Sequence, residues 1–546
     1  MADWSPGRWS LVAVPVTAVL AVSAAYLWTH PYPALAGGLY LSMAEAVVDN
    51  GYRLPATVAH YTSDGLPFSY PPLVLYAAAA TLDAGGSPLA VARYGPVVPL
   101  ALAAAALYYL GTRLLGRHDA AALAAVAVVT SPSVLQYTVS AGGFVRAGAL
   151  LFAVLGLITG LRVFRERADR WVVPSALLFG ATVLSHPKYG LFFAVSYLVF
   201  YGWFDRSLAG LLRGAVVALG GALVAAPWWW LVARRHGAEI FLRPMGTHGG
   251  VGSISWVSGV LAPQASPMSL WPALVAVAGV YVLARQRLFL PVWFGAVGVV
   301  VGNDEHLAVV GALLVATLVF EGVVPSLPVD WSRLRQSLPR TARLDRVRAL
   351  RSTGRSRPTR PARTSDGGES RFAGLALPSP AVVFVALLAT YGVASATVYV
   401  AEAGAADDFT TFVDDDDVEA MAWAKAETER DASFVVVGDA AEWFPLYANR
   451  TSLVAARGSE WSGDYGRLLR DRRRLSGCLS PECVSTVLNE SGHSPDYLYL
   501  ARDGYHVDNN PGLVEQRWRT LRPRLADAGY DLVFENDGAA VYRCSD

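Results

Sequence analysis

Long apolar stretches separated by short polar connections fill the first 400 residues of the chain. A helix needs about 20 mainly apolar residues to cross a bilayer, and eleven stretches approach or reach that length. They lie at residues 9–28, 92–111, 120–139, 147–165, 171–186, 188–204, 208–231, 268–284, 288–302, 305–325 and 376–400. We therefore predict a polytopic α-helical membrane protein with about 11 spans. The first is predicted to be a retained anchor, because its apolar part is longer than that of a signal peptide.

One shorter apolar segment, Tyr70 to Ala84, is predicted not to cross the membrane. It has roughly 14 apolar positions and begins with Pro71 and Pro72, which favours a shallow or re-entrant helix. This choice decides on which side of the membrane every later connection lies.

Polar segments divide the chain into four parts. Residues 1–325 form a membrane domain with a long exported loop at 29–91. Residues 326–375 are rich in Arg, Ser and Pro, and they have too few large apolar side chains to fold, so a disordered cytoplasmic loop is predicted. Its arginines either contact anionic lipid head groups or only follow the positive-inside rule. Residues 376–400 form the last span, and residues 401–546 form an exported soluble α/β domain.

Local patterns support the α/β prediction for the last part. Asp414 to Asp417 precede a helical pattern, where acidic side chains favour a helix N-terminus. The runs SFVVVG and DYLYLA predict strands, and PGLVEQRWRTLRPRLADAG predicts a helix. The runs YDLVFEN and GAAVYRC, separated by Asp537-Gly538, predict a closing hairpin.

Composition and charge exclude an ordinary soluble enzyme and sharpen this division. The chain is 53% hydrophobic and only 16% charged, against about 25% charged in soluble domains. Its net charge of +1 is the sum of a nearly uncharged membrane part, a basic loop and an acidic C-terminal part. Lys188 and Lys425 are its lysines. Such arginine usage resembles that of salt-loving archaea, and a genome of high GC content gives the same usage. No nucleic-acid partner is predicted.

The positions of the basic residues predict the orientation in the cell membrane. With the N-terminus in the cytoplasm, 23 Lys and Arg residues fall inside and 7 in the exported connections, which is the bias of the positive-inside rule. The C-terminal domain is then extracellular. It contains the sequons at Asn449 and Asn489, predicted glycosylation sites, and all three cysteines. A Cys478–Cys483 disulfide is predicted, the alternative being three unpaired cysteines.

The exported loop contains the most specific motif. An amphipathic pattern from Leu39 to Val48 predicts a short interfacial helix, and the chain re-enters at Phe68 to Tyr76, with the sequence FSYPPLVLY. With the Arg-terminated spans and the exported α/β tail, this arrangement resembles the GT-C glycosyltransferases. That superfamily includes protein O-mannosyltransferases, lipid A aminoarabinose transferases and the catalytic subunit of oligosaccharyltransferase, and the likeness is strongest to its archaeal members.

The resemblance implies transfer of a sugar from a polyprenyl-phosphate donor to a glycan or protein acceptor on the outer face. Such a reaction needs a carboxylate for the acceptor and positive charge for the leaving phosphate. The family places an acid near Gly37 or Gly38 and another in the loop that is SAGGFVR here. Both acids are missing, so a catalytically degenerate relative that binds polyprenyl lipid or assists envelope glycan assembly is the alternative function. A transporter is disfavoured, because no inverted repeat is present.

Asp64 and Glu45 are the candidate catalytic acids. Asp64 lies in the turn before the YPPL segment and Glu45 lies on the loop helix, the alternatives being a plain turn residue and a solvated helix face. The residues predicted to bind the donor phosphate or substrate are Tyr70, Arg146, His186, Lys188, Arg243 and His248. For the basic ones near span ends, snorkelling is the alternative, and for Arg243 and His248, in a late exported loop, a merely flexible loop is the alternative.

Two further groups complete the candidate chemistry. Asp304, Glu305 and His306 join two spans and are predicted to hold a divalent cation, Mg²⁺ or Mn²⁺, or the donor phosphate, the alternative being a solvated loop. In the C-terminal part, Glu442-Trp443-Phe444 and Glu460-Trp461 pair acids with aromatic residues. Such pairs either hold sugars or belong to the core of the domain.

Overall fold

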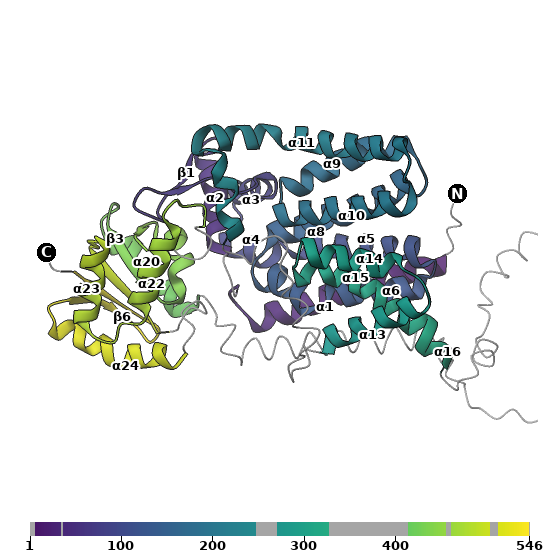
Figure 1. Ribbon diagram of the computed structural model, residues 1–546. Helices are drawn as coiled ribbons and strands as arrows, with labels where there is room; N and C mark the ends of the chain where they lie inside the picture. Colours follow the sequence, from purple (N-terminus) through teal and green to yellow (C-terminus); the bar gives the residue numbers. More distant parts are fainter. Residues whose placement is uncertain are drawn as a thin grey trace, which may run out of the picture.

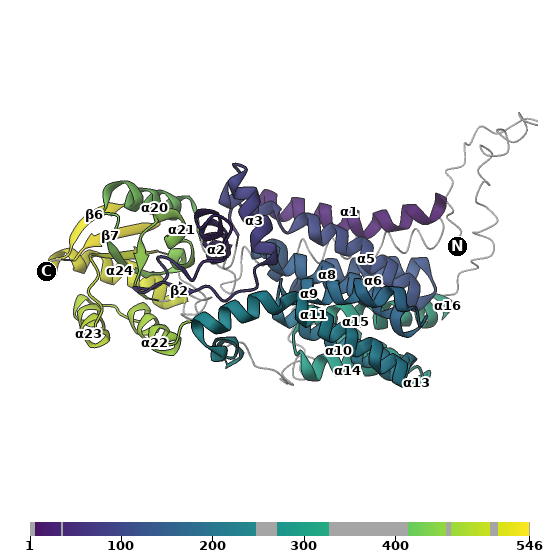
Figure 2. The ribbon, with the colours of Figure 1, turned by 90° about the horizontal axis from the view of Figure 1, so that it is seen from above.

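The protein consists of a helical bundle with an α/β domain at one end (Figures 1 and 2). The computed structural model describes residues 6–33, 37–246, 270–326, 413–454, 460–502 and 511–544. The first and larger part is helical. Its main α-helices are α1 (Pro6–Thr29), α2 (Gly37–Asp49), α3 (Leu73–Asp83), α4 (Pro88–Tyr94), α5 (Val97–Leu115), α6 (His118–Val129), α7 (Pro132–Leu135), α8 (Phe144–Phe164), α9 (Val172–Val183), α10 (Pro187–Phe204), α11 (Leu208–His236), α13 (Leu270–Ala284), α14 (Phe289–Val300), α15 (Asp304–Leu318) and α16 (Val324–Ser326).

Among the described residues, five helical segments are long and apolar enough to cross a membrane: Leu11–Thr29, Pro88–Leu115, Phe144–Phe164, Leu208–His236 and Asp304–Ser326. The pair His118–Val129 and Pro132–Ser140, bent by 52°, raises the number to 6 if it forms one broken span. The predicted count of about 11 is therefore not confirmed. The other predicted spans within the described residues coincide with the shorter helices α9, α10, α13 and α14. The stretches 331–371 and 376–400 lie outside the described residues.

Small residues let the helices of the bundle approach closely. A Cβ atom added to Gly111 of α5 would lie 2.9 Å from the Ala121 side chain of α6, and one added to Gly156 of α8 would overlap the Phe193 ring of α10. Between apolar helices in lipid, such close backbone contact supplies the van der Waals attraction that holds helices together. One buried polar contact, from Trp293 Nε1 to Ser196 Oγ at 2.9 Å, joins α14 to α10.

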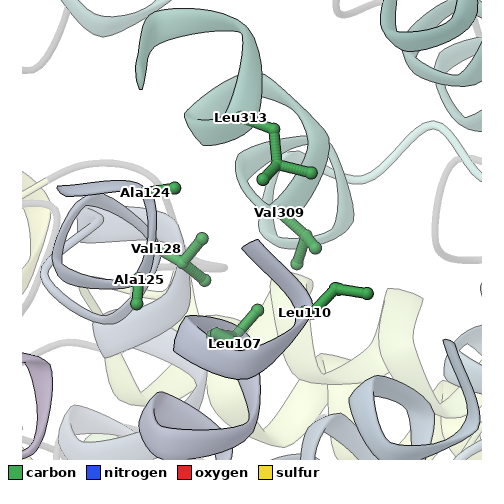
Figure 3. A pocket seen from close by; sticks show the side chains of 7 residues that line it. All are labelled: Leu107, Leu110, Ala124, Ala125, Val128, Val309 and Leu313. Carbon is green, nitrogen blue, oxygen red and sulfur yellow. The ribbon is translucent and has the colours of Figure 1, made fainter. Parts of the chain in front are cut away.

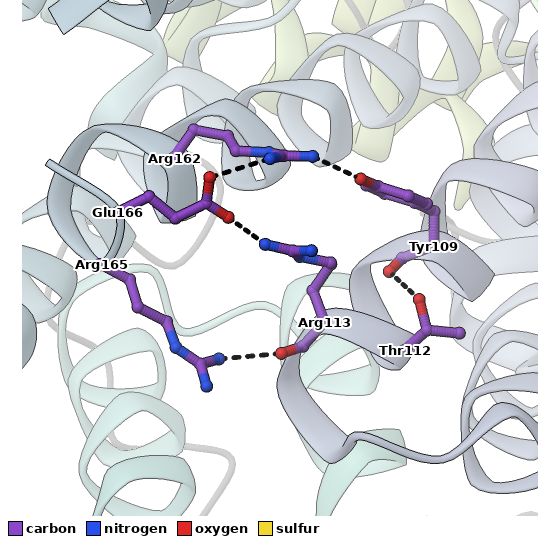
Figure 4. Close-up of polar contacts among 6 residues, drawn as sticks. All are labelled: Tyr109, Thr112, Arg113, Arg162, Arg165 and Glu166. Carbon is purple, nitrogen blue, oxygen red and sulfur yellow. Dashed lines mark hydrogen bonds and ion pairs between the residues drawn. The ribbon is translucent and has the colours of Figure 1, made fainter. Parts of the chain in front are cut away.

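Charged side chains gather at the C-terminal ends of α5 and α8 (Figure 4). Arg162 donates to Glu166 at 2.8 Å and to the Tyr109 hydroxyl at 2.7 Å, Arg165 donates to the Arg113 carbonyl at 2.8 Å, and Arg113 also contacts Glu166. Figure 4 shows these groups converging from the two helices. This network forms the arginine-rich end of α8.

The C-terminal domain is built on a five-stranded mixed sheet of order β4-β3-β5-β7-β6. Strand β3 (Ser433–Val437) pairs in parallel with β4 (Thr451–Ser452) and β5 (Tyr497–Ala501), while β7 (Ala539–Arg543) pairs antiparallel with β5 and with β6 (Asp531–Glu535). These elements confirm the two predicted strands and the closing hairpin. The helices of the domain are α20 (Asp415–Glu427), α21 (Phe444–Ala448), α22 (Tyr465–Ser476), α23 (Pro481–Ser491) and α24 (Pro511–Asp527).

The two faces of this sheet have different partners, because side chains alternate along a strand. Val435, Leu498 and Tyr542 face a core with residues of α22, α23 and α24. Phe434 and Tyr499 face a core that continues through α20 and α21 into the loop helix α2 and the re-entry segment. The C-terminal domain and the loop that follows α1 therefore share one hydrophobic core, and α2 lies between domain and bundle (Figure 2).

Backbone hydrogen bonds reinforce this junction. Within the loop, β1 (Thr57–Val58) pairs with β2 (Leu66–Pro67) in a small hairpin. Near its turn, the His60 carbonyl accepts from Ser452 N–H of β4 at 2.8 Å, and His60 Nδ1 lies 3.1 Å from Thr451 Oγ1. The C-terminal sheet thus holds the loop in place over one end of the bundle.

Candidate functional site

A buried ion pair at the N-terminal end of α8 is the centre of the candidate site. Arg146, in the first turn of α8, donates from Nη1 to Glu305 Oε1 at 3.0 Å, and the Glu305 side chain is only 1% exposed. The Tyr189 hydroxyl of α10 donates to Glu305 Oε2 at 3.2 Å. A carboxylate this deeply buried needs such partners, because an unpaired buried charge costs several kcal/mol. Glu305 therefore fixes Arg146 where α8, α10 and α15 meet.

A second cation lies at the same end of the bundle. Lys188 Nζ of α10 contacts Asn303 Oδ1, at the start of α15, at 3.2 Å. The Arg146 guanidinium lies 4.5 Å from the centre of the Tyr137 ring, a cation–π contact, and the His306 ring packs on Tyr189 at 4.3 Å. Two cations, Arg146 and Lys188, therefore lie at this end of the bundle, and Arg146 is the one paired with the buried Glu305.

The turn before α8 leaves no room for side chains. Gly142 has φ of +62°, a left-handed conformation that favours glycine, and a Cβ atom on Gly143 would lie 2.0 Å from the Tyr137 carbonyl oxygen. The residues Gln136–Ser140 form a π-helix, a distortion often found at functional sites. The missing acid of the SAGGFVR loop therefore has a local reason: this turn is built from glycine.

The re-entry segment brings tyrosines from the exported loop to the cations. The Tyr40 hydroxyl of α2 donates to the Tyr70 hydroxyl at 3.3 Å, and the Tyr70 ring meets the His186 ring at 6.2 Å, edge to face. The backbone N–H of Leu73, at the start of α3, donates to the Leu184 carbonyl at 2.9 Å. The YPPL and SHPK segments, separated by more than 100 residues, are thereby joined.

The C-terminal domain closes the site from the other side. The Trp461 ring meets the Tyr70 ring edge to face at 6.1 Å, and the Trp461 carbonyl accepts from Arg243 Nη1 at 3.0 Å. Arg243 follows α11, so this contact also ties the bundle to the domain. Predicted as a phosphate ligand, Arg243 here binds the backbone of the C-terminal domain.

Two buried glutamates of the C-terminal domain lie beside Tyr40. Glu442 is 1% exposed and Glu460 is 5% exposed. Burial raises the pKa of the Tyr40 hydroxyl, the charge of Arg146 and the hydrogen bond with Tyr70 oppose this shift, and the charges of Glu460 and Glu442 add to it. Tyr40 is therefore close enough to Arg146, Glu442 and Glu460 for the charge of each to act on it.

The glycines at the start of α2 are covered by the segment that carries Glu442. A Cβ atom on Gly37 would lie 2.9 Å from the Trp443 ring, and one on Gly38 would lie 2.4 Å from the Glu442 carbonyl oxygen. That carbonyl accepts from the Tyr61 hydroxyl at 3.0 Å. An acidic side chain at Gly38 would therefore displace the C-terminal domain.

The two predicted catalytic acids lie away from the buried ion pair. Asp64 is exposed in the turn between β1 and β2. Glu45 is half-buried on α2, where burial and the neighbouring Asp49 raise its pKa and Lys425 of the C-terminal domain opposes the shift. Of the predicted phosphate-binding residues, the structure brings together Tyr70, Arg146, His186 and Lys188. His248 lies outside the described residues.

The described residues do not fit the predicted divalent cation. Asp304, Glu305 and His306 are consecutive residues in the first turn of α15, and Glu305 is already bound by Arg146 and Tyr189. No group of three or more His, Cys, Asp or Glu side chains in the described part of the chain is arranged to hold a metal ion. The divalent cation therefore stays a prediction without support in these contacts, and the cations that the structure shows at this place are Arg146 and Lys188.

The remaining predicted residues lie in the C-terminal domain. Cys478 and Cys483 form the disulfide, with 5.5 Å between their Cα atoms, while Cys544 is free. Asn449 and Asn489 are both exposed, so both sequons are accessible. Away from the site, a small apolar pocket lies between α5, α6 and α15, lined by Leu107, Leu110, Ala124, Ala125, Val128, Val309 and Leu313 (Figure 3). All of these side chains are apolar, so they offer no group for catalysis.

Sequence reasoning did not assign Glu442 and Glu460 to the site. It noted both as acids beside aromatic residues, but it had no means of placing the C-terminal domain against α2. The available signal was the Gly37-Gly38 pair, since two glycines at the first positions of a helix are unfavourable unless another chain segment packs on them.

Comparisons with known proteins identify the fold. No protein-family model matches the chain, and no curated protein matches it. The structure is similar to that of ArnT from Cupriavidus metallidurans bound to undecaprenyl phosphate, with a TM-score of 0.54, 15% identity and coverage of 98% of each chain.

It is also similar to the Archaeoglobus fulgidus oligosaccharyltransferase tethered to an acceptor peptide containing the NVT sequon. There the TM-score is 0.55 and the identity 15%, with coverage of 100% of this chain and 75% of that one. The apo form of the same enzyme gives a TM-score of 0.53, 13% identity and coverage of 94% and 73%. The chain therefore has a GT-C-like fold.

Proposed function

We propose that this protein is a membrane glycosyltransferase that moves a sugar from a polyprenyl-phosphate-linked donor to a glycan or protein acceptor outside the cell. The observation that carries the proposal is a pair of cations at one end of the bundle: Arg146, bonded to the buried carboxylate of Glu305, and Lys188, bonded to Asn303. Arginine and lysine stabilise phosphate oxygens by charge-assisted hydrogen bonds, and in the proposed topology both lie in the first turn of their helices on the exported side, where lipid head groups would lie.

The surroundings suit the two other parts of such a donor. The apolar surface of the bundle would accommodate the polyprenyl chain in the bilayer. The aromatic rings of Tyr40, Tyr70 and Trp461 line the side of the site that faces the C-terminal domain, and aromatic faces are suited to hold sugar rings. In the transfer step, Arg146 and Lys188 would stabilise the charge that develops on the departing phosphate.

The structural neighbours support this substrate class. ArnT of similar fold was crystallised with undecaprenyl phosphate, and the archaeal oligosaccharyltransferase with an acceptor peptide. With the proposed reaction, the C-terminal domain and the loop 29–91 face the outside of the cell, and the arginine-rich end of α8 faces the cytoplasm. Arg146 at one end of α8 and Arg162 at the other are 16 residues apart, so about 24 Å of helix separates the candidate site from the arginine-rich end.

Surface glycans of the source strain test the proposal. We expect deletion of the gene to shorten at least one glycan, measured by mass spectrometry, and the wild-type chain supplied in trans to restore it. Arg146→Gln should restore none, whereas Arg162→Gln, at the opposite end of the same helix, should restore the glycan fully. A deletion strain with unchanged glycans would contradict the transferase and favour a degenerate protein that only binds lipid.

A further inference from the structure

The superfamily resemblance leads one to expect a catalytic acid at about Gly37 or Gly38 and another in the loop SAGGFVR, and neither place contains one. Two glycines at these places have no room for a side chain: Gly38 is covered by the Glu442 backbone, and Gly143 by the Tyr137 carbonyl. The site nevertheless contains acids near the tyrosines that face the cations. They come from the C-terminal domain.

We propose that the C-terminal domain supplies the catalytic carboxylates of this enzyme, through Glu442 and Glu460. This inference rests on the proposed function and names the groups that act on the acceptor. The backbone of Glu442 is fixed in place, because its carbonyl oxygen accepts a hydrogen bond from the Tyr61 hydroxyl and packs against Gly38. Glu460 precedes Trp461, whose ring contacts Tyr70 and whose carbonyl is held by Arg243.

The bundle and the C-terminal domain both contact one pair of aromatic rings, and they supply charges of opposite sign. On the bundle side, Arg146 is fixed by Glu305. On the domain side lie Glu442 and Glu460, both almost fully buried. Between them, Tyr40 and Tyr70 are hydrogen-bonded to each other. A phosphate at Arg146 and an acceptor at the glutamates would then be on opposite sides of a sugar held at the tyrosines, which suits attack from the face opposite the leaving group.

In the step that this geometry serves, an acceptor hydroxyl oxygen attacks the anomeric carbon of the donor sugar and forms the new C–O bond. The bond between that carbon and the phosphate oxygen breaks, and the polyprenyl phosphate leaves with the bonding electron pair. One of the two carboxylates takes the hydroxyl proton. No oxidant, reductant or further co-reactant is required.

Amide variants test the assignment with the full-length protein. Glu442→Gln and Glu460→Gln are supplied to the deletion strain, with Glu427→Gln, an exposed residue on α20 of the same domain, as the matched control. At equal protein level, we expect at least one of the two site variants to reduce the restored glycan by 100-fold or more, in the range of about 10²–10⁴ for loss of a general base. The control should restore it fully.

A second readout separates chemistry from folding. Undecaprenyl phosphate should raise the Tm of the purified variants in detergent as much as that of the wild type, because the phosphate site lies at Arg146. A variant that lost both the glycan and this increase would contradict the inference, since the glutamate would then hold the site together. Full restoration by both variants would also overturn it, while leaving the proposed function intact. Unchanged glycans in the deletion strain would instead remove the proposed function itself.

Discussion

At the scale of single residues, some members of the candidate site could be chosen from the sequence and others could not. Arg146 and Lys188 could be selected from the sequence, because a basic residue at a span end after a short exported loop is a recognisable pattern. Glu305 could be selected only as part of the cluster Asp304-Glu305-His306, which was expected to hold a divalent cation or the donor phosphate, whereas its partner in the structure is Arg146. Only the packing of helices distant in sequence could show that.

Gly38 gives a direct test of the junction. Gly38→Ala places a methyl group 2.4 Å from the Glu442 carbonyl oxygen. To relieve this overlap, the backbone of α2 or that of the Glu442 segment would have to move. We expect a loss of about 1–3 kcal/mol of stability, seen as a lower Tm in detergent, and a loss of glycan restoration. Gly202→Ala is the control, because Gly202 of α10 has open space around it and alanine favours a helix by up to about 1 kcal/mol. Equal Tm values for the two variants would refute the described contact.

The raised pKa of Glu45 predicts that the stability of the protein depends on pH. Burial raises its pKa above the ordinary value of 4.5, so the folded protein keeps this proton at pH values where the unfolded chain has released it. Stability from this group is therefore greatest below pH 4.5 and falls as the pH rises through the raised pKa. Glu45→Gln removes this loss, so the Tm of the variant minus that of the wild type should grow as the pH rises above 4.5. A constant difference from pH 4 to pH 7 would show that Glu45 is not desolvated.

At the scale of elements, the C-terminal domain was the most predictable part. Strands β3 and β5 are short continuous apolar runs, and α20 begins at the predicted acidic run, where the Asp414 side chain accepts from Asp417 N–H at 2.9 Å in a capping box. The bundle was less predictable. Apolar runs gave the positions of helices, but their lengths depend on kinks and turns such as the break at Ser131, which an apolar pattern does not show.

The Cys478–Cys483 disulfide joins the end of α22 to the start of α23. Because it closes a very short loop, we expect its removal by Cys478→Ser with Cys483→Ser to cost about 2 kcal/mol. Both helices pack on the sheet face opposite α2, so the loss should appear as faster proteolysis of the C-terminal domain, with undecaprenyl phosphate binding retained. If the double variant resists protease as well as the wild type, the bridge adds nothing to the stability of the folded domain.

For the whole molecule, the sequence predicted an arginine-rich end of the bundle and an opposite end with the candidate site, and the structure contains both. The arginine network of Figure 4 lies at one end of α8 and the candidate site at the other. What the sequence could not provide was the close seating of the C-terminal domain on α2, which depends on a core assembled from residues 39–79 and 413–541.

The sidedness of these ends is tested by labelling. In a Cys544→Ser background, we expect Ser63→Cys, in the exposed turn between β1 and β2, to react with a membrane-impermeant maleimide on intact cells. Arg170→Cys, exposed in the connection between α8 and α9, should react only after permeabilisation. The reverse pattern would invert the proposed orientation and place the candidate site in the cytoplasm.

The binding of undecaprenyl phosphate is the most direct test of the central claim, that Arg146 and Lys188 form a site for a polyprenyl phosphate. We predict that this lipid raises the Tm of the purified wild-type protein by a few degrees, since a ligand at about 100 times its Kd contributes about 2.7 kcal/mol. The increase should persist in Arg162→Gln and be lost in Arg146→Gln. An equal increase in Arg146→Gln, or none in the wild type, would contradict the account.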